Sequence, residues 1–203
     1  MWSCHRFQRV SADDPALGTA VVRAQDGDEA AFSALYRLVH PGLLGYLRGI
    51  VGEGAEDIAA AAWREIAREL PRFRGDGQGF RGWTASIARR HARGDLRRRG
   101  ASPGSLGSSW TPPAEDHTAH SLPGATLSAE TAQALVARLP RAQAEALLLR
   151  HAVRLDEPTA ARVMGRPRAV VRILARRGAK SLAHLLGPDD VTHGVARTLG
   201  EPT

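Results

Sequence analysis

A change in composition near the middle of the chain divides the sequence into two parts. From Gly100 to Ala125, glycine, serine and proline account for 13 of 26 residues, a composition that favours a flexible linker over packed helix or sheet. A linker of this length and composition spans roughly 28 Å on average. We therefore expect an N-terminal extension at 1–25, a first module at 26–99, a linker at 100–126, a second module at 127–187 and a tail at 188–203.

Apolar residues on both sides of the linker recur at helical spacing, with no sustained strand alternation. In the first module they predict two short core helices that meet at Pro41, formed by Phe32, Leu35, Tyr36 and Val39 and then by Leu43, Leu47, Ile50 and Val51. A third helix is expected at about 55–70 and a fourth at about 80–98. In the second module a short helix, a turn at 165–167 and a long helix to about residue 186 are typical of a helix-turn-helix. The expected fold class is all-α: two small helical domains joined by a flexible linker, the second a helix-turn-helix.

The excess of positive charge is confined to two segments of the chain. The net charge is +7, and 27 of the 28 basic residues are arginine. Residues 72–99 carry a balance of +7 and residues 166–180 a balance of +6, so the rest of the chain sums to −6. A coding bias would explain the preference for arginine over lysine but not this clustering. Two basic segments on an otherwise acidic chain indicate a polyanion bound at two places.

Both basic segments present their charges at helical spacing, which places arginines on the side of each helix away from its apolar residues. Trp83 and Phe80 have two open readings, because aromatic rings at this spacing either pack in a core or stack on unpaired bases. The candidate nucleic-acid contacts of the first segment are Arg74, Phe80, Trp83, Arg89, Arg90, Arg93, Arg97 and Arg98. Those of the second segment are Arg166, Arg168, Arg172, Arg176 and Arg177.

Several classes of protein are disfavoured by what the sequence lacks. A single cysteine, Cys4, makes no internal disulfide, and no window approaches the ~20 consecutive apolar residues of a spanning helix. His117 and His120, with Cys4 and His5, lack a third well-spaced metal ligand. No phosphate-binding glycine loop, nucleophile elbow or pair of catalytic carboxylates is present. We expect a cytoplasmic protein that is not an enzyme, with no catalytic residue, metal, cofactor or membrane insertion.

Three motifs occur in a characteristic order over residues 28–186. The first is Ala55-Glu56-Asp57-Ile58 with Trp63, the second is Phe80-Arg81-Gly82-Trp83, and the third is Leu139-Pro140-Arg141-Ala142-Gln143 followed by the turn at 165–167. In this order they resemble the extracytoplasmic-function (ECF) sigma factors of bacterial RNA polymerase. The resemblance implies a protein that binds core RNA polymerase and directs promoter recognition, promoter melting and transcription initiation.

The resemblance also implies partners and site residues. The partners would be core RNA polymerase, promoter DNA and an anti-sigma factor that clamps the two modules. The first basic segment would contact the downstream promoter element and the second the upstream element. The polymerase-binding residues would be Glu56, Asp57, Ile58 and Trp63.

Among the positions that depart from the usual pattern of that family, three bear on polymerase binding. Ala60 and Ala61 stand where the family usually carries a glutamine and an acid, and Thr159 stands in place of a customary glutamate. These differences leave open an alternative function, a stand-alone helix-turn-helix DNA-binding transcriptional regulator without productive polymerase binding. A protein that binds single-stranded DNA or RNA is a third interpretation.

Overall fold

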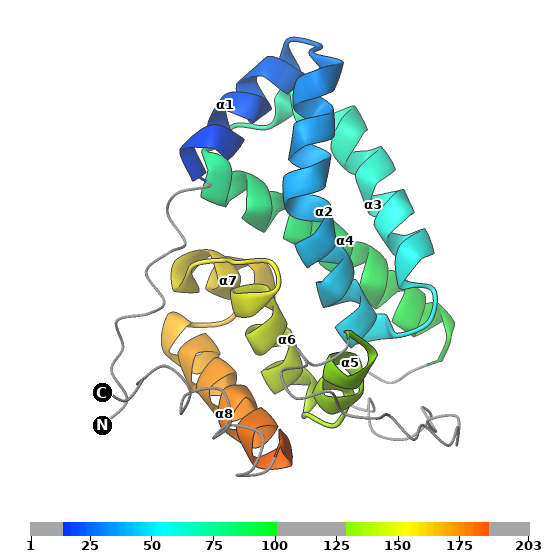
Figure 1. The fold of residues 1–203 in the computed structure, drawn as a ribbon, viewed down its shortest axis with the longest axis vertical. Helices are drawn as coiled ribbons and strands as arrows, with labels where there is room; N and C mark the ends of the chain where they lie inside the picture. The colour runs from blue at the N-terminus through cyan, green and yellow to red at the C-terminus, as the bar shows by residue number, and fades with distance from the viewer. Residues whose placement is uncertain (1–13, 101–128, 187–203) are drawn as a thin grey trace, which may run out of the picture.

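The computed structural model describes residues 14–100 and 129–186, and every regular element in these two ranges is a helix (Figure 1). The all-α fold is therefore confirmed for this part of the chain. The expected linker beyond Gly100, the expected tail and residues 1–13 lie outside it. The elements are α1 (Asp14–Gln25), α2 (Glu29–Val51), α3 (Ala55–Glu69), the short 3-10 helix η2 (Leu70–Arg72), α4 (Gly77–Arg98), α5 (Ala129–Ala137), α6 (Arg141–His151), α7 (Glu157–Met164) and α8 (Arg168–Leu186).

Helix α2 is continuous through Pro41, so the prediction of two short helices there is wrong. Asp28 caps the helix, because its side chain accepts a hydrogen bond from the Ala31 N–H (2.9 Å). A proline inside a helix costs about 3 kcal/mol. Four aliphatic side chains nevertheless form one fully buried face across it: Leu35, Val39, Leu43 and Leu47. Burial of each contributes ~1.5 to 3 kcal/mol, which outweighs the cost of the proline.

The first module begins earlier than the sequence indicated. Residues 14–25 were assigned to the N-terminal extension, but they form α1, which packs against α2 and α4. Leu17 and Val21 are buried in the same core as the apolar face of α2. Helices α1 to α4 therefore make up the first module, and α5 to α8 the second.

The two modules are packed against each other. Helix α6 contacts α2, and α7 contacts α4 (Figure 1). Leu149, Val153 and Leu155 of the second module belong to the same buried cluster as Leu43 and Tyr46 of the first. We call this the docked arrangement, since the modules share one hydrophobic core.

Glycines allow the modules to approach closely. A Cβ atom on Gly42 of α2 would lie 2.3 Å from the backbone oxygen of Ala152, and one on Gly82 of α4 would lie 2.2 Å from Cγ2 of Thr159. Thr159 is itself buried. Thr159, which departs from the family pattern, thus fills space between the modules.

Helices α7 and α8 flank the turn that the sequence predicted at 165–167. Asp156 caps α7 by accepting the Thr159 N–H (2.8 Å). Gly165 ends it with φ +65°, a left-handed conformation that favours glycine. Helix α8 follows directly and has few buried residues. No helix within the described ranges combines the length and the apolar character needed to cross a membrane.

Candidate nucleic-acid interface

Helix α4 carries most of the candidate residues of the first basic segment. It begins after Asp76, whose side chain accepts the Gly79 N–H (2.7 Å). One face of the helix is buried, with Phe80, Ile87, Ala88, Ala92 and Leu96 in the core. The candidate residues Arg90, Arg93, Arg97 and Arg98 are exposed. The prediction that one face packs while another carries arginines is confirmed for these positions.

The two candidate aromatic residues differ in exposure. Phe80 is fully buried, and its ring centroid lies 5.6 Å from that of Phe73 and 5.8 Å from that of Trp83. Trp83 is only partly buried. The structure therefore places Phe80 in the core, one of its two open readings, so its ring offers no surface for stacking on a base. Trp83 is the candidate aromatic residue that keeps exposed surface.

Arg89 faces the second module rather than solvent. Its Nε donates to Oε1 of Glu145 on α6 (2.5 Å), and its Nη2 contacts the Met164 carbonyl oxygen at 3.4 Å. The Arg89 and Glu145 side chains are 17% and 13% exposed. Burial alone would lower the pKa of Arg89, but the hydrogen bond and charge of Glu145 outweigh it and raise that pKa. A residue predicted to contact DNA thus holds the modules together in the docked arrangement.

Tyr46 of α2 completes this inter-module cluster. Its hydroxyl donates to Oε1 of Glu145 at 3.3 Å, and its ring is fully buried. Burial first, and then the negative charge of Glu145, raise the pKa of Tyr46 well above its usual value. We call Tyr46, Arg89 and Glu145 the inter-module polar cluster.

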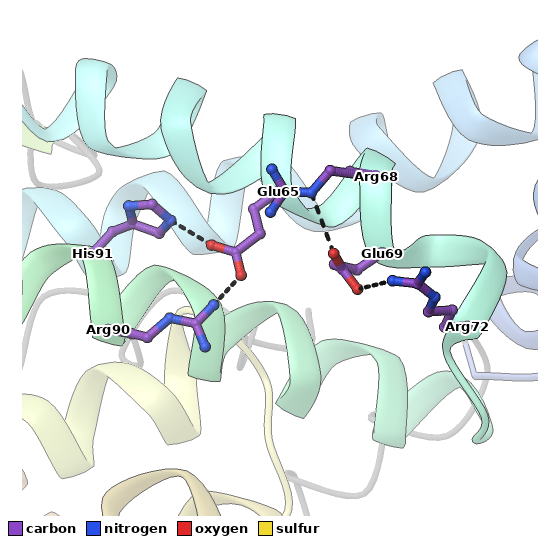
Figure 2. A network of polar contacts seen from close by, with 6 residues as sticks. All are labelled: Glu65, Arg68, Glu69, Arg72, Arg90 and His91. Atoms are coloured by element: carbon purple, nitrogen blue, oxygen red, sulfur yellow. Dashed lines mark hydrogen bonds and ion pairs between the residues drawn. The ribbon is translucent and has the colours of Figure 1, made fainter.

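Arg90 forms an ion pair within the first module. It donates to Glu65 of α3, which also contacts His91 Nε2 at 2.8 Å (Figure 2). Burial would raise the pKa of Glu65, but the hydrogen bonds from His91 and Arg90 outweigh it and lower that pKa. A second carboxylate in the same view, Glu69, accepts from Arg68 and Arg72 at 3.2 and 3.3 Å. The Arg90 side chain is nevertheless 63% exposed, so DNA would have to compete with Glu65 for it.

The remaining candidates lie at the surface. The Nη1 atom of Arg74 donates to the carbonyl oxygens of Pro71 and Phe73 at 3.0 and 2.8 Å, which fixes that side chain before α4. Arg98 lies 3.6 Å from Asp95, and Arg172 of α8 lies 3.9 Å from Glu157. All five candidates of the second segment are exposed: Arg166, Arg168, Arg172, Arg176 and Arg177.

The two basic segments meet at a cavity of about 210 Å³ between α2, α4 and the second module. Five arginines and one carboxylate, Glu145, line it; the arginines are Arg89, Arg93, Arg97, Arg141 and Arg166. We call it the arginine cavity. Burial lowers the pKa of Arg141, and the charges of Arg93 and Arg89 act in the same direction, whereas Glu145 and Tyr46 oppose them. Residues far apart in the sequence thus form one electropositive site.

Sequence comparisons identify the family. The sequence from 35 to 102 matches Sigma-70 region 2. Over 181 residues the chain is 32% identical to the ECF RNA polymerase sigma factor ShbA of Streptomyces griseus subsp. griseus, an alignment that covers 83% of this chain and 94% of the relative. This chain belongs to the ECF sigma factor family. A second relative, the ECF RNA polymerase sigma factor BldN of Streptomyces coelicolor, is 29% identical over 194 residues, with 92% of this chain and 71% of BldN covered.

Solved structures agree with this sigma factor in fold. CnrH, in complex with the cytosolic domain of CnrY, matches with a TM-score of 0.58 and 21% identity, over 84% of this chain and 97% of the other. The sigma factor RpoE, in complex with the anti-sigma factor NepR from Bartonella quintana, matches with a TM-score of 0.61 and 21% identity, over 78% and 98%. At these identities the likeness concerns the fold alone.

The predicted polymerase-binding residues of this sigma factor divide into exposed and buried pairs. Glu56 and Asp57 are exposed in the first turn of α3, whereas Ile58 and Trp63 are buried. The side-chain hydrogen bond from Arg48 (2.6 Å) is the main cause that lowers the pKa of Glu56. A partner that binds the start of α3 would therefore contact the two carboxylates directly. The two buried side chains would hold the helix in place from inside the core.

Sequence reasoning missed an exposed aromatic group beside this face. Tyr36, expected in the core, is 39% exposed, and its ring stacks on His40 with centroids 4.4 Å apart. The buried Trp63 donates its Nε1–H to His40 Nδ1 (3.1 Å). Helical spacing placed Tyr36 on the apolar stripe, but its position at the edge of that stripe left one ring face in solvent.

Proposed function

We propose that this sigma factor binds core RNA polymerase and directs it to promoters through two DNA-contacting surfaces. The single observation that supports this most strongly is the exposed positive charge on α4 and α8, carried by the two segments that hold all the excess positive charge of the chain. Exposed arginines bind phosphates, and the same residues bind guanine edges in the major groove. The sigma factor would perform no chemistry of its own.

The first surface would bind and open the downstream promoter element. Arg93, Arg97 and Arg98 would contact the backbone near the end of α4, with Trp83 nearer the start of the same helix as the stacking platform. Unstacking a base pair costs a few kcal/mol. Stacking of each unpaired base on an aromatic ring returns ~1 to 3 kcal/mol. The stacking free energy is therefore comparable to the cost of unstacking.

The second surface would bind the upstream element. Arg168, Arg172 and Arg176 recur every four residues on α8, so they follow one face of the helix. A helix that enters the major groove with such a row has the geometry of a recognition helix. The turn that contains Arg166 would approach the adjacent backbone.

Polymerase would bind the exposed start of α3. Glu56 and Asp57 would supply negative charge there, and the exposed ring of Tyr36, which packs against Trp63, would extend the surface further along α3. Because RpoE was solved with the anti-sigma factor NepR, we also propose an anti-sigma partner for this sigma factor. We propose a cytoplasmic location as well, because core polymerase and promoter DNA would be its partners there.

The docked arrangement would be a resting state. Arg89 and Arg93 of the downstream set line the same cavity as Arg166 of the upstream set. Residues that face one shared cavity are not free to engage two separate promoter elements. The modules would therefore separate before both surfaces bind DNA.

Run-off transcription with purified core polymerase tests the proposal. We expect promoter-dependent transcripts from genomic fragments only when the sigma factor is added, with core enzyme alone as the control. Failure to obtain a transcript from any fragment, together with tight binding to duplex DNA and no co-purification with polymerase, would instead support the stand-alone regulator. Comparable affinity for RNA, independent of the second module, would support the third interpretation.

A further inference from the structure

The arginine cavity contains more positive charge than its surroundings neutralise. Glu145 is the one carboxylate among its described lining residues, and it already pairs with Arg89. Within residues 14–100 and 129–186, none of the other four arginines of the cavity makes an ion pair. Charges of one sign in a partly enclosed space repel one another. Burial is the first cause that lowers the pKa of Arg141, and the neighbouring charges of Arg93 and Arg89 act in the same direction.

The N-terminus of α6 adds to the positive potential. Arg141 is the first residue of this helix, and no side chain caps it. The helix dipole is positive at this end, so an arginine there is unfavourable and an anion is favourable. The position of Arg141 therefore opposes helix stability and favours an anionic ligand.

The size of the cavity limits the ligand. Sites for drug-sized molecules occupy about 300 to 1,000 Å³, whereas the arginine cavity occupies about 210 Å³. A DNA duplex is too wide to enter a cavity of this volume. A second hollow of about 310 Å³ shares Arg89, Arg93 and Arg97 with it and adds Ser86 and Arg90. The arginine cavity thus suits a short chain of phosphates, and the second hollow has room for a group attached to that chain.

We propose that the arginine cavity binds a small polyphosphate, a di- or triphosphate that is either free or part of a nucleotide. The planar guanidinium group binds phosphate oxygens through two parallel hydrogen bonds, which makes arginine the residue best suited to this ligand. Arg93 and Arg97 contribute from the first module, and Arg141 and Arg166 from the second. A ligand held by both modules favours the docked arrangement, and by linkage it weakens any binding that requires separation.

This inference goes beyond the proposed function, and its test needs neither polymerase nor promoter. The full chain is titrated by isothermal calorimetry with orthophosphate, pyrophosphate, tripolyphosphate and ATP, each at an ionic strength matched with sodium chloride. We expect one site, with pyrophosphate and tripolyphosphate binding on the order of tenfold more tightly than orthophosphate, since more guanidinium groups are engaged. Tighter binding of ATP than of tripolyphosphate would identify a nucleotide, and the reverse a free polyphosphate.

Two variants locate the site. In the double variant Arg141→Gln with Arg166→Gln we expect affinity for tripolyphosphate to fall on the order of tenfold or more, as two charge-assisted contacts are lost. The matched control is Arg138→Gln, an exposed arginine of the same module outside the cavity, which should bind as the unchanged chain does. Neither Arg141 nor Arg166 makes an ion pair with another described residue, and both add to like-charge repulsion, so the double variant should melt at the same temperature as the unchanged chain or higher in circular dichroism.

A conservative variant keeps the test decisive if the double variant loses stability. Arg141→Lys preserves the charge but not the planar fork, and should bind tripolyphosphate more weakly than the unchanged chain while melting at the same temperature. Absence of binding by every polyphosphate, or equal affinity in the cavity variants and the control, would overturn the inference. Run-off transcription would be unaffected by that result, so the two proposals fail separately.

Discussion

At the scale of single residues, Glu145 has the largest role in the docked arrangement. It accepts hydrogen bonds from Tyr46 and Arg89 across the module boundary. Removing its charge leaves the largely buried guanidinium of Arg89 unpaired. Glu145→Gln should lower the free energy of unfolding by about 3 kcal/mol, the low end for a buried pair because both side chains keep some exposure.

Urea unfolding measures this effect, with Glu69→Gln as the control. Glu69 pairs with Arg68 and Arg72 on the surface, and loss of that contact should cost less than ~1 kcal/mol. Equal losses in the two variants would contradict a special role for Glu145.

His40 makes stability depend on pH. Burial first, and then the charge of Arg48, lower its pKa below the usual 6.5. The unfolded chain therefore binds a proton more readily than the folded one, so stability is full above pH 6.5 and falls as the pH drops toward the folded pKa. Protonation also removes the lone pair that accepts the Trp63 hydrogen bond. Urea unfolding across this range should show the loss, and His40→Gln should reduce it.

The control for that experiment is His151→Gln. The pKa of His151 is also lowered, by burial and by the charge of Arg150. This variant therefore reports how much of the pH dependence of the free energy of unfolding comes from the second module. An unchanged pH dependence of the free energy of unfolding in His40→Gln would contradict a lowered pKa of His40 in the folded chain.

At the scale of elements, two helix glycines have opposite roles. A Cβ atom at Gly42 would meet the backbone of Ala152, which has little freedom to move, whereas one at Gly94 would lie 3.5 Å from the flexible end of Arg98. Gly42→Ala should destabilise the chain by about 1 to 3 kcal/mol through forced separation of α2 from Ala152. Gly94→Ala should stabilise it by roughly 0.5 to 1 kcal/mol through helix propensity.

Thermal unfolding tests both glycine predictions: the melting temperature should fall in Gly42→Ala and rise in Gly94→Ala. A stabilised Gly42→Ala would mean that Ala152 and its neighbours shift without cost, and that the close approach is incidental to docking.

The elements were largely predictable from periodicity, whereas the contacts between modules were not. The helices expected at 55–70 and 80–98 are observed at Ala55–Glu69 and Gly77–Arg98. Pro41 misled the prediction because its local cost is visible in the sequence, while the burial that exceeds it is tertiary. Arg89 and Glu145 are 56 positions apart, and no local spacing indicates such a pair. Arg141 was singled out through the family motif alone, and its place in the cavity required the fold.

At the scale of the whole molecule, the docked arrangement should limit DNA binding. If only separated modules bind a promoter, the apparent affinity is the intrinsic affinity multiplied by the separated fraction. Gly42→Ala favours separation, so it should bind an upstream-element duplex more tightly, by up to about tenfold if separation is favoured by about 1.4 kcal/mol. Fluorescence anisotropy at one fixed salt concentration measures this. Weaker binding by a folded Gly42→Ala would show that docking assists DNA recognition.

The shared core also gives the docked arrangement a temperature dependence. Leu149, Val153 and Leu155 lie in one buried cluster with Leu43 and Tyr46, so separation exposes carbon surface to water. The free energy gained by burying such surface shrinks on cooling. The ion pair between Arg89 and Glu145 changes in the same direction, because the cost of dehydrating its charges rises as temperature falls. Chilling should therefore loosen the association of the two modules, and if the docked arrangement is the resting state, a larger share of the protein would be ready for a promoter in a colder cell.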